Sequence, residues 1–295
     1  MTIADGIWQQ VFNFDHYGEL LALVGNSLVV GAALGLVGGL VGVFVIMRDL
    51  PFAVHGISEL SFAGASAALL LGVNIVAGSI VGSLIAAGAI GLLGSRARDR
   101  NSVIGVIMPF GLGLGVLFLA LYKGRAANKF GLLTGQIVAV DTPQMSWLLG
   151  TSAVVLVALA VMWRPLAFAS ADPEVAEARG VPVRALSFAF MIVLGLAVAL
   201  SVQIVGALLV LTLVVTPAAA AARVTASPVL LPLLSVVFAV ASIEGGILLA
   251  LGSSIPISPY VTTISFAIYL GCRLLGRRRK TIREETPLRE EARPT

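Results

Sequence analysis

Two side chains four residues apart, His55 and Glu59, are the part of this sequence with the most suggestive chemistry. In a helix, residues four apart lie one above the other on the same face. An imidazole nitrogen and a carboxylate placed in this way can both reach one cation, and both are ordinary ligands of divalent transition metals. The pair lies at the start of a long apolar run, where ionisable groups are costly and usually mark a pathway or a pair. The spacing therefore indicates a metal or proton site.

The same pair has a plainer interpretation. Arg48, Asp49 and Pro51 precede it and suggest a loop followed by a helix start. His55 and Glu59 could then lie in the headgroup region as a surface ion pair, because this spacing recurs by accident in many helices. The choice between the two interpretations depends on the rest of the chain.

The composition is that of a membrane protein. The chain of 295 residues is 58% hydrophobic and 12% charged, whereas a soluble domain carries about 25% charged residues. The net charge of +4 does not indicate nucleic-acid binding, because the basic residues gather beside apolar segments, where they set topology and contact lipid headgroups. The single cysteine, Cys272, excludes an internal disulfide. We therefore expect an all-α, polytopic helical bundle in the lipid bilayer.

Apolar runs of about 20 residues are long enough to cross a bilayer and predict eight or nine transmembrane elements. They lie at about 19–47, 52–72, 75–94, 103–122, 146–163, 185–202, 204–222, 228–252 and 258–275. Pro217 predicts a break within one run, and Pro232 predicts another near the next run. The less apolar segment 123–145 is a candidate re-entrant or interfacial piece.

The expected organisation is one permease domain between two short ends. The transmembrane domain spans 19–276, after an extracytoplasmic segment 1–18 and before a basic, then mixed-charge cytoplasmic tail 277–295, whose end we expect to be disordered. Basic residues gather in three loops that the positive-inside rule assigns to the cytoplasm. These loops are 96–100, 164–184 and 273–280. Nine crossings would then place the N-terminus outside.

The segment 164–184 contains a pattern typical of a short capped helix. Asp172 suits the N-cap, Pro173 the first helical position, Glu174 the positive end of the helix dipole and Gly180 the position after the C-cap. From this local pattern the helix is either a docking element for a cytoplasmic partner or an ordinary interfacial helix.

Two further acidic sites have open interpretations. Glu244 lies within an apolar run and either pairs with a backbone group or an arginine, or forms part of a translocation path. His16, beside Asp15 and Glu19, either receives metal from a donor protein or belongs to a solvated face.

The sequence contains no phosphate-binding loop, nucleophile elbow or HExxH pair. We therefore expect no enzyme activity from this chain, and any ATP hydrolysis that drives it must come from a separate subunit.

Five motifs, in order, resemble the permease subunit of the bacterial ABC importers for manganese, zinc or iron, the ABC-3 family. They are VFVIMRDLPFAVHGISELSFAG, SRARDRNSVIGVIMPFGLGLGVL, LLTGQIVAVDTPQ, DPEVAEARGVP and SVQIVGALLVLTLVVTPAAAAARV. The resemblance covers most of residues 20–275. It implies a multi-pass permease in the bacterial cell membrane with no tightly bound cofactor, its cargo being the metal. Its partners would be a pair of cytoplasmic ATP-binding subunits, an extracytoplasmic metal-binding protein and a second permease copy.

The resemblance also implies site residues. In the family, an Asp and a His four residues later help to bind the metal in transit. The Asp falls on His55 and the His on Glu59, while Ser58 and Gly64 keep their places. The two ligand types are exchanged, but one imidazole and one carboxylate remain on one face, and Ser58 and Glu244 are candidate pathway residues. Two facing chains would offer two His and two Glu, a suitable set for manganese, zinc or iron.

By the same resemblance, the motif at 172–182 is similar to the coupling helix that docks on the ATP-binding subunit. Asp172, Glu174 and Gly180 would shape this helix, and Ala176 and Ala178 would let it sit closely in a groove.

Two other kinds of transporter remain as alternatives. A proton-coupled secondary metal transporter would use His55, Glu59 and Glu244 as a relay, although we find no matching halves of the kind such carriers often show. An ABC permease for a larger substrate, such as a metal chelate or a vitamin, would leave the His55–Glu59 pair without a purpose.

Overall fold

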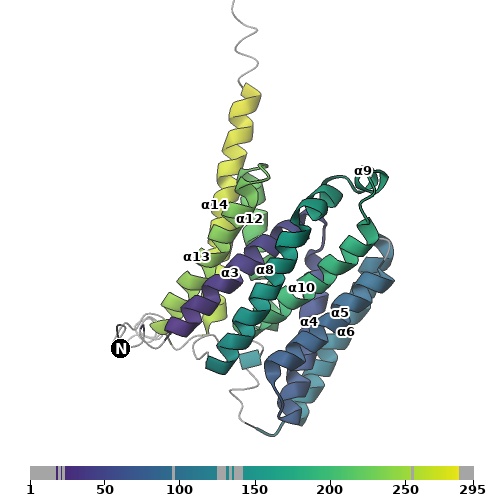
Figure 1. Ribbon diagram of the computed structural model, residues 1–295. Coiled ribbons are helices and arrows are strands. Elements are labelled where there is room, and N and C mark those ends of the chain that lie inside the picture. The colour runs from purple at the N-terminus through teal and green to yellow at the C-terminus, as the bar shows by residue number, and fades with distance from the viewer. Residues whose placement is uncertain are drawn as a thin grey trace, which may run out of the picture.

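The computed structural model describes residues 18, 21, 24–94, 97–124, 131–132, 135, 142–253 and 256–285, with the backbone alone at 97–99, 204, 208 and 277–285. Helices account for the regular structure of this part of the chain, and no strand occurs in it, as the all-α prediction requires (Figure 1). The His16 cluster, most of 123–141 and the end of the tail fall outside the described residues.

Within the described residues, seven helices are long and apolar enough to cross a membrane. They are α3 (Gly25–Met47), α4 (Pro51–Leu71), α5 (Ile75–Leu93), α6 (Ala97–Leu121), α8 (Thr142–Ala171), α10 (Val183–Val205) and α13 (Leu230–Leu251). The bundle is completed by α14 (Ile257–Glu285) and by a broken segment, which consists of η2 (Ala207–Leu209), α11 (Val210–Val214) and α12 (Thr216–Val224). The short α9 (Pro173–Ala178) joins α8 to α10.

The break predicted at Pro217 is confirmed. Pro217 lies at the start of α12, directly after α11 ends at Val214, because its missing N–H cannot continue the helix. Near the break, the carbonyl of Thr212 accepts a hydrogen bond from Ser265 Oγ on α14 at 3.2 Å. At the end of α10, Val205 O accepts from Ser258 Oγ on α14 at 2.6 Å. The break predicted near Pro232 is wrong: this proline lies in the first turn of α13, where its nitrogen needs no intrahelical partner.

Two helices extend beyond their predicted ends. We expected a span at 146–163, but α8 runs from Thr142 to Ala171 and contains Pro165. The irregular part of the segment 164–184 is therefore confined to the surroundings of α9. Similarly, α14 continues to Glu285, where we expected a disordered tail to have begun, because the Arg, Lys and Glu residues of this stretch are good helix formers.

Small residues bring the helices of the bundle together at backbone distance. A Cβ added to Gly35 of α3 would lie 2.8 Å from the Cα of Val240 on α13. Ser235 Oγ on α13 donates to the carbonyl of Gly39 on α3 at 2.6 Å. On α4, Gly64 faces the backbone of Gly78 on α5. Without a hydrophobic driving force between helices in lipid, such close packing supplies much of the association energy.

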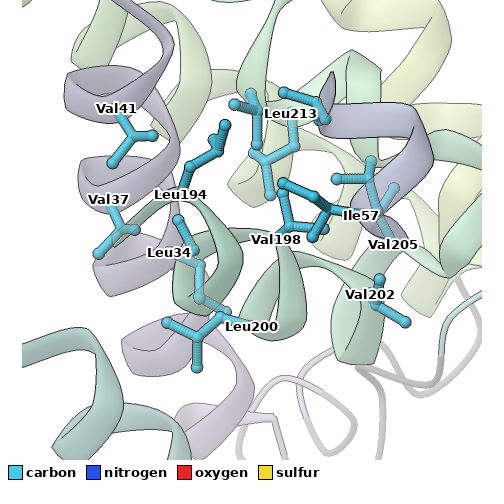
Figure 2. Close-up of a cluster of buried hydrophobic side chains, with 14 of the residues drawn as sticks. Leu34, Val37, Val41, Ile57, Leu194, Val198, Leu200, Val202, Val205 and Leu213 are labelled. Carbon is cyan, nitrogen blue, oxygen red and sulfur yellow. The ribbon is translucent and has the colours of Figure 1, made fainter. Parts of the chain in front are cut away.

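A cluster of apolar side chains fills the space between α3, α4, α10 and the broken segment (Figure 2). Its labelled members are Leu34, Val37, Val41, Ile57, Leu194, Val198, Leu200, Val202, Val205 and Leu213. The cluster fixes the start of α4, and with it His55 and Glu59, against α10 and α11.

Several loops meet at the end of the bundle that carries α9. The guanidinium of Arg48, after α3, donates to Ser170 at the end of α8 and to Ser187 near the start of α10. The side chain of Arg100 reaches the carbonyl of Asp49 at 3.5 Å. Figure 1 shows the C-terminal end of α14 pointing in the same general direction as α9. Arg48 and Arg100 therefore lie at the end of the bundle that carries α9, the end that the positive-inside rule assigns to the cytoplasm.

We predict that Gly82→Ala on α5 destabilises the fold by roughly 1–3 kcal/mol, the usual cost of overpacking. A Cβ at Gly82 would collide with the carbonyl oxygen of Leu60 on α4, and backbone cannot move aside cheaply. Thermal unfolding in detergent measures the effect. Gly88→Ala on the same helix is the matched control, because no atom lies within 4 Å of its added Cβ. Equal melting temperatures for the two variants would contradict the tight α4–α5 contact.

Candidate functional site

His55 and Glu59 lie on one face of α4, as predicted. Their side chains are separated by 3.5 Å between His55 Nε2 and Glu59 Oε1. Glu59 is the ninth of the 21 residues of α4, near the middle of the helix. A position this deep follows from Pro51, which starts the helix eight residues earlier.

The pair is not exposed on the surface. The Glu59 side chain is 4% exposed and the His55 side chain 28% exposed. At this level α6 packs closely on α4, because Gly111 has no side chain and its helix approaches the α4 backbone at Glu59 and Leu60. The plainer interpretation, a pair exposed on the surface, does not fit the burial of Glu59.

The distance between the two side chains suits a shared cation. Ligand atoms that each lie about 2.1 Å from a tetrahedral metal are about 3.4 Å apart, close to the 3.5 Å seen between His55 and Glu59. The other carboxylate oxygen, Glu59 Oε2, is buried and has no hydrogen-bond partner in the part of the chain that the structure describes. A buried oxygen of this kind is costly unless a proton, a cation or a donor from another chain satisfies it.

Two serines on α4, Ser58 and Ser66, differ in their hydrogen bonding. Ser58 Oγ donates to the carbonyl of His55 at 2.8 Å, so its hydrogen is already committed within the helix. Ser66, which the sequence did not lead us to single out, is fully buried, and no described residue forms a hydrogen bond with its hydroxyl. It follows Glu59 by seven residues, a spacing that returns to the same face of a helix. The seven-residue spacing from Glu59 could therefore have identified Ser66 from the sequence.

One chain supplies few metal ligands at this place. No group of three or more His, Cys, Asp or Glu side chains able to hold a metal occurs among the described residues. His55 and Glu59 therefore provide two ligands, whereas divalent transition metals take four to six. The remaining ligands would have to be water, backbone or a second chain.

Glu244 lies elsewhere in the bundle. On α13, its Oε1 would lie 2.9 Å from a Cβ added to Gly31 of α3, and it has no hydrogen-bond partner within the described ranges. Because α13 packs chiefly on α3, α14 and α12 rather than on α4, the structure does not bring Glu244 together with His55 and Glu59. A relay through all three residues has no support from this geometry.

The predicted caps of the short helix α9 are present. The side chain of Asp172 accepts a hydrogen bond from the Val175 nitrogen at 3.0 Å, and Glu174 lies in the first turn. Gly180 has a φ of 81°, and the N–H of Val181 donates back to Ala176 O at 3.0 Å. These bonds form a Schellman motif, which requires a left-handed residue and so favours glycine.

The surface of α9 differs from the prediction at one residue. Ala176 is 0% exposed, so it holds α9 against the protein's own helices and offers no surface to a partner. Ala178, Glu174 and Glu177 are exposed. A six-residue helix with capped ends and an exposed charged face is therefore presented beyond the ends of α8 and α10.

Similar proteins are known. The family model described as "ABC 3 transport family" matches residues 21–275. The manganese import system permease protein ScaB of Streptococcus parasanguinis is 32% identical over 197 residues, which is 66% of this chain and 70% of ScaB. The high-affinity zinc uptake system membrane protein ZnuB of Haemophilus influenzae is 27% identical over 245 residues, covering 83% of this chain and 94% of ZnuB.

The fold is also that of a solved structure, PsaBC from Streptococcus pneumoniae in complex with Fab. The two chains match with a TM-score of 0.75 and 26% sequence identity, over 92% of this chain and 95% of that chain. A match to the family model over 21–275, together with this fold, shows that the chain belongs to the ABC 3 transport family and is a multi-pass protein of the cell membrane.

Proposed function

We propose that this chain, as the membrane-spanning permease subunit of an ATP-driven importer, passes a divalent transition metal into the cell and holds it in transit at His55 and Glu59. The observation that carries the site is the buried Glu59 carboxylate: its Oε2 has no hydrogen-bond partner among the described residues, and its Oε1 lies 3.5 Å from His55 Nε2. The relatives named for manganese and zinc make Mn²⁺, Zn²⁺ and Fe²⁺ the candidate cargoes, because all three accept mixed nitrogen and oxygen ligands.

Two ligands from one chain suit a transit site better than a storage site. A pathway must bind its ion well enough to admit it and weakly enough to release it. The partial exposure of His55, 28% of its side chain, leaves an open side on which a second copy of the permease would add its own His and Glu. Symmetric pairing of this kind is the commonest way in which oligomers build a shared site.

The chain itself hydrolyses no ATP in this proposal. A separate pair of ATP-binding subunits docks on α9, whose exposed residues Glu174, Glu177 and Ala178 form the contact surface. An extracytoplasmic binding protein delivers the metal at the opposite end of the bundle. There, Asn74, Gln144 and Gln203 line a pocket of about 350 Å³.

We predict that His55→Ala and Glu59→Ala each abolish ATP-dependent metal uptake, because each removes half of the ligands that one chain supplies. Uptake of Mn²⁺, Zn²⁺ and Fe²⁺ into proteoliposomes that contain the assembled transporter is the measurement. The double variant His55→Asp with Glu59→His is the matched control, since it keeps one imidazole and one carboxylate on the same face and should retain uptake.

Native uptake by both alanine variants would contradict the metal site. Uptake that needs a proton gradient and not ATP would instead favour a secondary transporter. Transport of a metal chelate but not of the free ion would favour a permease for larger substrates.

We further predict that Ala178→Trp prevents the ATP-binding subunits from co-purifying with the permease, because the indole would occupy the surface where α9 docks. Ala120→Trp is the matched control. Ala120 is also exposed, but it lies near the C-terminal end of α6, at the opposite end of the bundle from α9. Normal ATPase recovery with both variants would show that α9 is only an interfacial helix.

A further inference from the structure

Arg48 lies between the short helix α9 and the candidate metal site. It is the C-cap residue of α3, three residues before α4 begins and seven before His55. Its Nε donates to Ser170 Oγ at 2.9 Å, and its Nη1 donates to Ser187 Oγ at 3.2 Å. Ser170 lies at the end of α8, just before α9, and Ser187 lies near the start of α10, just after it. One side chain thus joins both helices that carry α9, and we call the contacts of Arg48 with Ser170 and Ser187 the junction.

The two serines are oriented to receive Arg48. Ser170 Oγ donates its hydrogen to Leu166 O at 2.6 Å, and Ser187 Oγ donates to Val183 O at 2.7 Å. With these hydrogens committed, the oxygen lone pairs remain to accept from the guanidinium. The planar fork of arginine can serve two acceptors at once, which the single ammonium of lysine does less well.

Aromatic rings beneath the guanidinium also hold Arg48 in position at the junction. Arg48 lies 5.7 Å from the ring centroid of Phe190 on α10. Phe44 on α3 packs edge-on against Phe190 at 5.9 Å and against Trp163 on α8 at 4.8 Å. Burial lowers the pKa of Arg48, and the neighbouring charge of Arg100 lowers it further. Holding a cation here is costly, so its contacts have to compensate.

The turn after Arg48 links it tightly to α4. Leu50 is 3% exposed, and its N–H donates to Val45 O at 2.9 Å. Asp49 has a φ of 53°, a left-handed conformation that is unusual for a residue other than glycine. Arg100, from the start of α6, adds a contact to the Asp49 carbonyl at 3.5 Å. A displacement of Arg48 would therefore move the start of α4.

We propose that Arg48 is a positioning residue that transmits displacement of α9 to α4, and hence to His55 and Glu59. The inference rests on the proposed function, because α9 is taken to be driven by the ATP-binding subunits. Arg48 touches neither metal nor nucleotide. It acts by making α8, α9, α10 and the start of α4 move as one unit.

The first test compares metal transported with ATP hydrolysed in the reconstituted importer. In Arg48→Met, and in Ser170→Ala with Ser187→Ala, we expect assembly and ATP hydrolysis close to native. Metal transported per ATP should fall by about tenfold, the size expected when a hydrogen bond to a charged group is lost. Arg164→Met is the matched control, since Arg164 is an exposed arginine of α8 that takes no part in the junction.

Two results would overturn the proposal. One is an unchanged ratio of metal to ATP. The other is a loss of assembly or ATP hydrolysis in proportion to uptake, which would make Arg48 a structural or docking residue. If Arg48→Met fails to assemble, the paired serine variant decides, because it keeps the arginine and removes only its acceptors.

A second test does not depend on metal transport and so separates this inference from the proposed function. Spin labels are placed at Phe52, which is 71% exposed at the start of α4, and at the exposed Glu177 on α9, in a Cys272→Ser background. With Arg48 present, the distance between the labels should be the same with and without a non-hydrolysable ATP analogue bound to the partner subunits. With Arg48→Met the distance should change on nucleotide binding. Identical behaviour of the two proteins would refute the coupling, whatever the cargo.

Discussion

A carboxylate buried in the middle of a membrane helix is the constraint on which this structure depends. The Glu59 side chain is only 4% exposed, and its Oε2 has no hydrogen-bond partner among the described residues. Burying an ionisable group in a membrane helix costs free energy, and such a group usually belongs to a transport pathway or a charged pair. His55 Nε2 lies 3.5 Å from Glu59 Oε1, so a single cation bound between the two side chains could be a ligand partner of both.

The rest of the bundle holds α4 in place through glycines and serines. Gly64 meets Gly78, and Ser61 Oγ lies 2.7 Å from Ser79 Oγ, so that α4 and α5 pack backbone to backbone. Gly111 allows α6 to approach the α4 backbone at Glu59 and Leu60. At the α9 end, Arg48 joins α8 and α10 to the turn before α4. The proposed metal site and the proposed coupling through Arg48 therefore both depend on closely packed helices.

Much of this could be predicted from the sequence because membrane spans, caps and breaks depend on local residues. The capped helix at Asp172–Gly180 and the break at Pro217 are both present. Helix lengths were less predictable, since Pro165 and Pro232 are accommodated within helices. The hydrogen bonds of Arg48 join residues more than a hundred positions apart, and no local pattern carries that information. The burial of Ala176 depends on how α9 packs against α8 and α10, which the pattern of caps does not specify.

The most direct measurement is X-ray absorption at the edge of the transported metal, on the assembled importer loaded with that metal. The account predicts an imidazole ligand with oxygen ligands, and loss of the imidazole signal in His55→Ala. The chain's only other histidine is His16, so the comparison is clear. A coordination shell made of oxygen alone, or one unchanged by His55→Ala, would contradict the claim that this site holds the metal.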